Sequence, residues 1–402
     1  MTSVLRNIPQ TIFTQANILP VSQASYKLLH LATLLRFYGW IAPMTILKTV
    51  IQFQARQKSE PAAKWGVMRV IRVALARAYS TTTYKWSLQP PATISQRRCA
   101  PATHLGGDLK AHHISVKKAS DEYYTGECAR ARRYIHPAMS VPCFWIYPQH
   151  TPFDLSRIHE EKVILFLHGG GYISEHPLSL PAGAYGVRET GHKCLAVNYR
   201  LSDGINGHPA PLQDCVTAYV YLTQTLGVRG ENVAVVGDSA GGNAANALIF
   251  HLLQLKQEGT AITLPRFVSL ISPWSDMTAT FPSIAGNREC DVLPPFSSQS
   301  ELVRSHLKWT PESIANKYNS PALQEHVAFR GWQEHTLKVH IQVGQAEILR
   351  DEGVALAQLL RDAGVETLFT MIEGEVHDAV NINPHAELAK RDFLMGLQWG
   401  GF

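Results

Sequence analysis

Cysteine is scarce in this chain of 402 residues, and the few cysteines are not grouped. The six that occur include no C-x-x-C pair and no cluster with histidine at metal-ligand spacing. Acceptor sites for N-linked glycans of the form N-x-S/T are absent as well. We therefore expect reduced, mostly buried thiols in an intracellular protein that is not secreted and that binds no metal.

Acidic residues are almost missing from the first hundred residues, where Glu60 stands against thirteen lysines and arginines. Residues 101–402 hold 24 basic and 31 acidic residues, so a segment with a net charge of +12 precedes a mildly acidic body. Nucleic-acid binding needs a basic groove on the folded surface, so we expect no nucleic-acid partner. The basic segment instead suits an anionic membrane surface.

A long uninterrupted apolar run is also missing. The most apolar stretch, residues 28–53, contains a clean run of only 11 residues, whereas a spanning helix needs about 20. Residues 65–79 predict a basic amphipathic helix, suited to a membrane surface or to docking on the body as a cap. We expect residues 1–104 to form a basic helical segment of this kind. A membrane-spanning helix and a cleavable mitochondrial transit peptide are further alternatives.

From residue 105 onward, short apolar runs alternate with helical stretches. The candidate strands are 110–116, 141–146, 163–167, 194–198, 233–236, 267–271, 339–343 and 367–372. The candidate helices are 212–225, 242–255, 351–362 and 385–397. Buried strands that alternate with helices predict an α/β protein with a mostly parallel eight-stranded sheet and helices on both faces. The first two strands adjoin without a helix, as an antiparallel edge would.

One interval breaks this alternation. Residues 275–335 are rich in proline and serine with scattered aromatics, and they are too long for a simple loop. We expect a lid inserted into a catalytic domain that spans residues 105–402.

The segment Gly237-Asp238-Ser239-Ala240-Gly241 lies between a predicted strand and a predicted helix. This is the context of a G-x-S-x-G nucleophile elbow, in which the chain turns so sharply that the flanking positions have no room for side chains. The elbow lifts the serine hydroxyl above the sheet, at a helix N-terminus that stabilises negative charge. We predict that Ser239 is a nucleophile.

A glycine-rich segment, His168-Gly169-Gly170-Gly171, follows the strand predicted at 163–167. Consecutive glycines let main-chain N–H groups approach a substrate oxygen closely. We predict an oxyanion hole formed by Gly170, Gly171 and Ala240, the residue after the nucleophile.

A serine nucleophile of this type needs an acid and a histidine later in the chain. His377 follows the strand predicted at 367–372, and Glu347 and Asp351 follow the one at 339–343. We predict His377 as the base and Glu347 as the acid, because Glu347 lies at the mouth of its strand. Asp351 is the alternative acid, although its position one turn later suits helix N-terminal charge stabilisation.

With these motifs the chain resembles α/β-hydrolases of the hormone-sensitive lipase-like family, which includes arylacetamide deacetylases and fungal steryl acetyl hydrolases. The resemblance covers residues 105 to about 400. Its matching segments are 168–171, 198–201, 237–242, 272–276, 349–353 and His377. The chain departs from the family by the insertion of residues 202–207 and by Glu347, where the family usually has aspartate.

The resemblance implies a serine carboxylester hydrolase without a cofactor. Its substrate would be a hydrophobic small-molecule ester with a short acyl group, such as acetyl, on a hydrophobic alcohol. A small-ligand receptor on the same scaffold and an acyltransferase with the same triad remain as alternatives. We also expect attachment to the endoplasmic reticulum or another organelle surface through the basic segment. The sequence predicts no oligomeric state.

Overall fold

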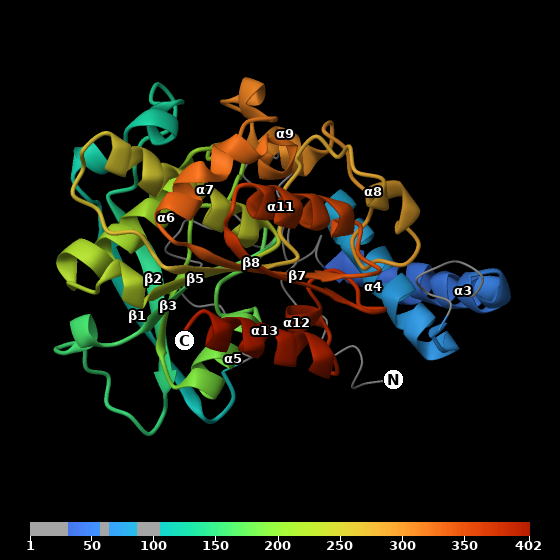
Figure 1. Cartoon of the computed structure of the whole chain (residues 1–402). Coiled ribbons are helices and arrows are strands. Elements are labelled where there is room, and N and C mark those ends of the chain that lie inside the picture. The colour runs from blue at the N-terminus through green and yellow to red at the C-terminus, as the bar shows by residue number, and fades with distance from the viewer. Residues whose placement is uncertain (1–30, 57–63, 87–104) are drawn as a thin grey trace.

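The computed structural model describes residues 31–56, 64–86 and 105–402 (Figure 1). Its centre is an eight-stranded sheet with the order β1-β2-β4-β3-β5-β6-β7-β8. The strands are β1 Leu109–Lys117, β2 Ser140–Pro148, β3 Val163–Leu167, β4 Lys193–Val197, β5 Val233–Asp238, β6 Phe267–Ile271, β7 Lys338–Gly344 and β8 Glu366–Ile372. β1 and β2 pair antiparallel, as expected, and β2 is also antiparallel to β4. The other pairs are parallel, which confirms the predicted sheet.

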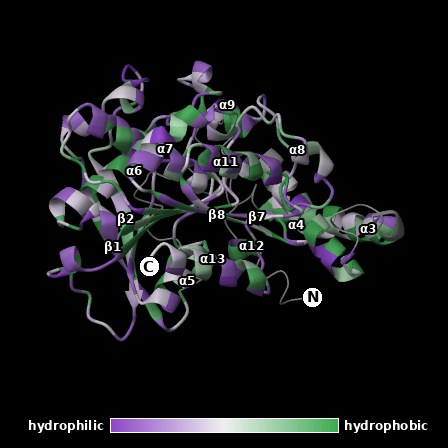
Figure 2. Cartoon of the chain, in the orientation of Figure 1, coloured by the Kyte–Doolittle hydropathy of each residue, from purple (hydrophilic) through white to green (hydrophobic). Residues whose placement is uncertain are grey.

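Helices cover both faces of the sheet (Figure 1). One face carries α6 Ala210–Val220, α7 Ala240–Gln257 and α11 Arg350–Asp362, and the other carries α5 Pro181–Thr190, α12 Ala379–Ile382 and α13 Glu387–Trp399. Each face has its own cluster of buried apolar side chains, and the hydrophobic colour follows the central strands in Figure 2. Sequence patterning did not predict α5, which contains two glycines. A Cβ at Gly183 would lie 2.9 Å from the Phe166 ring, so glycine lets α5 pack tightly on β3.

The interval predicted as a lid contains the short helices α8 Ser283–Gly286, α9 Glu301–His306 and α10 Arg330–Glu334. The five cysteines among the described residues are all buried.

Two N-terminal helices lie side by side at the right of the molecule in Figure 1, and one of them packs against the loops that follow β7 and β8. α4 Val67–Trp86 is longer than the predicted amphipathic helix, and α3 Ala42–Arg56 continues from helical turns that begin at residue 31. Within the described residues, one helix, Leu31–Phe53, is long enough and apolar enough to cross a membrane, judged by length and composition only. This helix is longer than the 11-residue apolar run because it continues through Arg36 and Lys48. Predictions for residues 1–30, 57–63 and 87–104 lie outside the described residues.

Candidate active site

Ser239 lies at the sharp turn between β5 and α7, as the motif predicts. Its backbone has φ 54° and ψ −118°, a strained conformation for a residue with a side chain. Both flanking glycines are required, because a Cβ at Gly237 would lie 2.2 Å from the Gly241 carbonyl oxygen. A Cβ at Gly241 would lie 1.9 Å from the carbonyl oxygen of Leu167.

His377 lies in the loop after β8 and contacts the serine. His377 Nε2 and Ser239 Oγ are 3.0 Å apart, which is hydrogen-bond distance. The two residues are 138 positions apart in the sequence, and both are buried. The structure therefore brings together the predicted nucleophile and the predicted base.

Glu347 is fully buried on the other side of the imidazole. Its Oε2 lies 3.6 Å from His377 Nδ1, longer than a standard hydrogen bond. The Ser272 hydroxyl donates to the same oxygen at 2.5 Å, and the Asp378 N–H donates to Ser272 Oγ at 3.0 Å. Ser272 thus links the acid to the residue that follows the histidine, and small movements on substrate binding can shorten the Glu347–His377 contact.

Asp351, the alternative acid, lies in the first turn of α11. Its carboxylate accepts a hydrogen bond from Arg350 Nε at 2.7 Å, and its N–H donates to Ser283 Oγ at 3.1 Å. These contacts fit the helix-terminal role, and Glu347 is the carboxylate that faces the histidine.

Charges around His377 favour its protonated form. Burial lowers the pKa of His377, but the Glu347, Asp291 and Asp238 carboxylates outweigh this and raise it above the ordinary value. For the two neighbouring carboxyl groups, Asp238 and Asp378, burial acts in the opposite direction and raises the pKa. Asp378 raises the pKa of Asp238 further. This carboxyl pair flanks the serine and the histidine along the chain.

The glycine-rich segment passes directly over the elbow. A Cβ at Gly169 would lie 2.2 Å from Asp238 Oδ2, and one at Gly170 would lie 2.4 Å from the Ser174 carbonyl oxygen. Gly170 and Gly171 both have positive φ, at 103° and 61°. Side chains are thus excluded where the main chain approaches the serine.

His168 packs against Tyr199 and does not line the cavity. Its buried ring stacks on Tyr199 with ring centroids 4.3 Å apart, and the Tyr199 hydroxyl donates to the His168 carbonyl oxygen. Ala240 is buried at the start of α7, so its N–H lies at the helix N-terminus beside Ser239.

A cavity of about 980 Å³ opens above Ser239 and is lined by Gly170, Gly171 and His377. Its walls are mostly apolar and come from α4 and from the predicted lid. They include Val73, Leu75, Ala76, Leu293, Pro294 and Phe296. Within the described residues, no group of three or more His, Cys, Asp or Glu side chains is placed to hold a metal ion.

Sequence reasoning missed two acidic residues here. Glu175 lines the cavity with φ 70°, and burial raises its pKa to about 7. Asp291, in the interval predicted as a lid, accepts a hydrogen bond from the His377 N–H, 86 positions away in the sequence. No motif marks either residue, because both contacts depend on loops that meet only in the folded chain.

A family model described as the alpha/beta hydrolase fold matches residues 164–381. The chain is 28% identical to an ethyl acetate hydrolase from Pseudomonas putida, over 58% of this chain and 70% of that protein. It is 25% identical to steryl acetyl hydrolase 1 from Saccharomyces cerevisiae, over 55% of this chain and 52% of that protein.

Among solved structures, an esterase from the bacterial hormone-sensitive lipase family superposes with a TM-score of 0.58 at 23% identity. The superposition covers 83% of this chain and 97% of that one. The chain therefore belongs to the α/β-hydrolase family and is a hydrolase of the carboxylesterase type.

Proposed function

We propose that the protein hydrolyses esters of short acyl groups, acetyl above all, with hydrophobic alcohols. One observation carries this proposal: Ser239 Oγ lies 3.0 Å from His377 Nε2 in the wall of an apolar cavity of about 980 Å³. This arrangement supplies an activated nucleophile where a hydrophobic ester can bind.

In the proposed reaction, Ser239 Oγ attacks the ester carbonyl carbon while His377 Nε2 takes the hydroxyl proton. Glu347 orients the imidazole and stabilises its positive charge. The N–H groups of Gly170, Gly171 and Ala240 stabilise the oxyanion. His377 then returns the proton to the departing alkoxide, which leaves as the alcohol. In the second half of the reaction, His377 takes a proton from water while the water oxygen attacks the acyl carbon. The bond to Ser239 Oγ then breaks, Oγ takes the proton back from His377, and the carboxylic acid leaves.

The size of the cavity supports a bulky apolar alcohol. An acetyl group fills a small part of about 980 Å³, which leaves most of the volume for the alcohol. Two of the similar proteins are named for acetyl esters, one of ethanol and one of sterols. The receptor alternative is disfavoured, because a ligand-binding role does not need the Ser239–His377 contact.

An acyl-length series tests the proposal. We expect kcat/KM to be highest for acetyl or butyryl esters of one alcohol and to fall about tenfold or more by the octanoyl ester. With the acyl group held at acetyl, a sterol-sized alcohol should give a lower KM than ethanol. An optimum at palmitoyl esters or at long-chain triglycerides would contradict the proposal. Transfer of the acyl group to an added alcohol, in place of hydrolysis, would favour the alternative that the protein is an acyltransferase.

We also propose that the N-terminal helices attach the enzyme to an anionic membrane. Large apolar side chains on α3 and the turns before it are exposed, and the hydrophobic colour is clear on α3 in Figure 2. Leu35, Trp40 and Ile51 have 65%, 68% and 73% of their surface exposed. Each basic residue near an anionic bilayer contributes about 1 kcal/mol, and buried apolar side chains add to this.

Membrane fractionation tests this attachment. At low ionic strength we expect the protein in the membrane fraction, with release of at least part of it by high salt. Replacing Leu35, Trp40 and Ile51 together by serine should move it toward the soluble fraction. Ile205→Ser, which changes a residue 75% exposed on the hydrolase body, should have no such effect. Quantitative recovery of the unaltered protein in the soluble fraction, or its secretion, would refute the proposal.

A further inference from the structure

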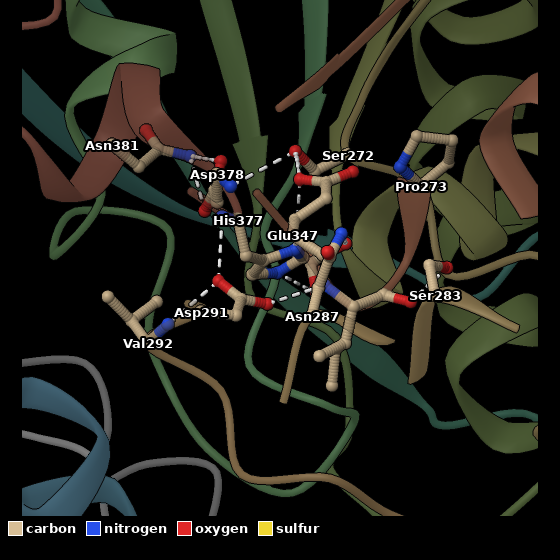
Figure 3. Close-up of polar contacts among 12 residues, drawn as sticks. Ser272, Pro273, Ser283, Asn287, Asp291, Val292, Glu347, His377, Asp378 and Asn381 are labelled. Carbon is tan, nitrogen blue, oxygen red and sulfur yellow. Dashed lines mark hydrogen bonds and ion pairs between the residues drawn. The ribbon is translucent and has the colours of Figure 1, made fainter. Parts of the chain in front are cut away.

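Asp291 is a buried carboxylate in the lid, and each of its oxygens accepts main-chain hydrogen bonds (Figure 3). Oδ1 accepts from the His377 N–H at 2.9 Å and from the Val292 N–H at 2.7 Å. Oδ2 accepts from the Ile348 N–H at 2.8 Å. Ile348 directly follows Glu347. The Asp291 side chain therefore joins the loop that carries His377 to the loop that carries Glu347.

The residues just before Asp291 hold the acid loop as well. Asn287 Nδ2 donates to the Glu347 carbonyl oxygen at 2.8 Å, and Ser283 Oγ donates to the Ile348 carbonyl oxygen at 2.7 Å. We call residues 283–292 the strap. The strap therefore fixes the main chain at Glu347 and at the residue that follows it.

α4 in turn contacts the strap. Arg77 donates to the Asp291 carbonyl oxygen at 2.8 Å and pairs with Glu289 at 3.3 Å. Cys290 of the strap packs in one apolar cluster with Trp65 and Val73. The strap is thus held between the N-terminal helix and the two loops that carry Glu347 and His377.

We propose that Asp291 is a positioning residue for ester hydrolysis: it fixes the Glu347 and His377 loops relative to each other and places a negative charge beside the imidazole. The inference rests on the proposed function. Asp291 does not line the cavity, so it acts through His377 and Glu347 rather than on substrate.

The charge of Asp291 matters because His377 becomes an imidazolium during the reaction. Burial lowers the pKa of His377, and Glu347, Asp291 and Asp238 raise it against that effect. Burial raises the pKa of Asp291 itself to about 6, while His377 lowers it and Glu347 raises it. Asp291 is therefore mostly ionised at pH 7 and above, where it can stabilise the imidazolium.

Asp291→Asn tests the proposal, because asparagine has nearly the same shape but no charge and one acceptor fewer. We expect kcat to fall about 10- to 100-fold with a smaller change in KM. The acidic limb of kcat/KM against pH should move to lower pH, because it follows the pKa of His377 in the free enzyme. Asp291→Glu keeps the charge but displaces the acceptors, so it should lower kcat and leave the acidic limb near its original pH.

Glu231→Gln is the control, since it removes a carboxylate just before β5, outside both the strap and the cavity, whose side chain is 53% exposed. It should change neither kcat nor the acidic limb. Thermal unfolding shows whether each variant is folded, and if Asp291→Asn does not fold, Asp291→Glu carries the test through its kcat. Wild-type kcat in a folded Asp291 variant would overturn the proposal, and so would a lower kcat in Asp291→Asn with an unmoved acidic limb. Absence of esterase activity in the unaltered protein would instead overturn the proposed function.

Discussion

Ser239→Ala is expected to lower kcat for ester hydrolysis by about 10⁴- to 10⁶-fold, because the variant lacks the atom that forms the acyl-enzyme. The fold should persist. Alanine keeps the Cβ that the strained backbone at φ 54° already accommodates, and the Ser239 N–H bond to the Ile271 carbonyl oxygen involves main chain alone. Initial rates on an acetyl ester, together with thermal unfolding of both proteins, measure the two effects separately.

Ser156→Ala is a suitable control, because Ser156 lies outside the cavity and bonds to Asp154 near the surface. It should keep wild-type kcat. Turnover by Ser239→Ala close to that of the unaltered protein would end the assignment of Ser239 as nucleophile.

Glu347→Gln is expected to lower kcat by about 10²- to 10⁴-fold, whereas Asp351→Asn should have a small effect. Glu347 Oε2 is the carboxylate oxygen 3.6 Å from His377 Nδ1. Glutamine can still accept the Ser272 hydrogen bond, but it carries no charge to stabilise the imidazolium. Asp351 pairs with Arg350 in α11, so its loss should chiefly affect the helix end.

Both variants are compared by kcat on one acetyl ester at a pH where His377 is neutral. If Asp351→Asn proves to be the crippled variant and Glu347→Gln the active one, the assignment of the acid is wrong.

The strands and the elbow could be predicted because their signals are local. β3 and β6 have the predicted bounds, since short buried apolar runs between turn residues indicate parallel strands. The Ser239 turn follows from two glycines whose neighbours leave no space for a Cβ. These features depend on residues that are close together in the sequence.

Other features could not be predicted because they depend on contacts between distant segments. α5 contains glycines that disfavour a helix alone, and its packing on Phe166 and Ile164 compensates for them. The amphipathic pattern of α4 fits a membrane surface as well as a cap, and in the structure one side of α4 forms part of the cavity wall. The position of Asp291 depends on three loops that meet only after folding.

The central claim is that Ser239 carries the acyl group during ester hydrolysis. A fluorophosphonate, which reacts with activated serine hydroxyls, tests it when intact mass, peptide mapping and residual activity are followed in one sample. We predict one label per chain on the peptide that contains Ser239, loss of activity in proportion to labelling, and no label in Ser239→Ala. A protein that keeps its activity when Ser239 is fully labelled, or loses it while Ser239 stays unlabelled, would contradict the account.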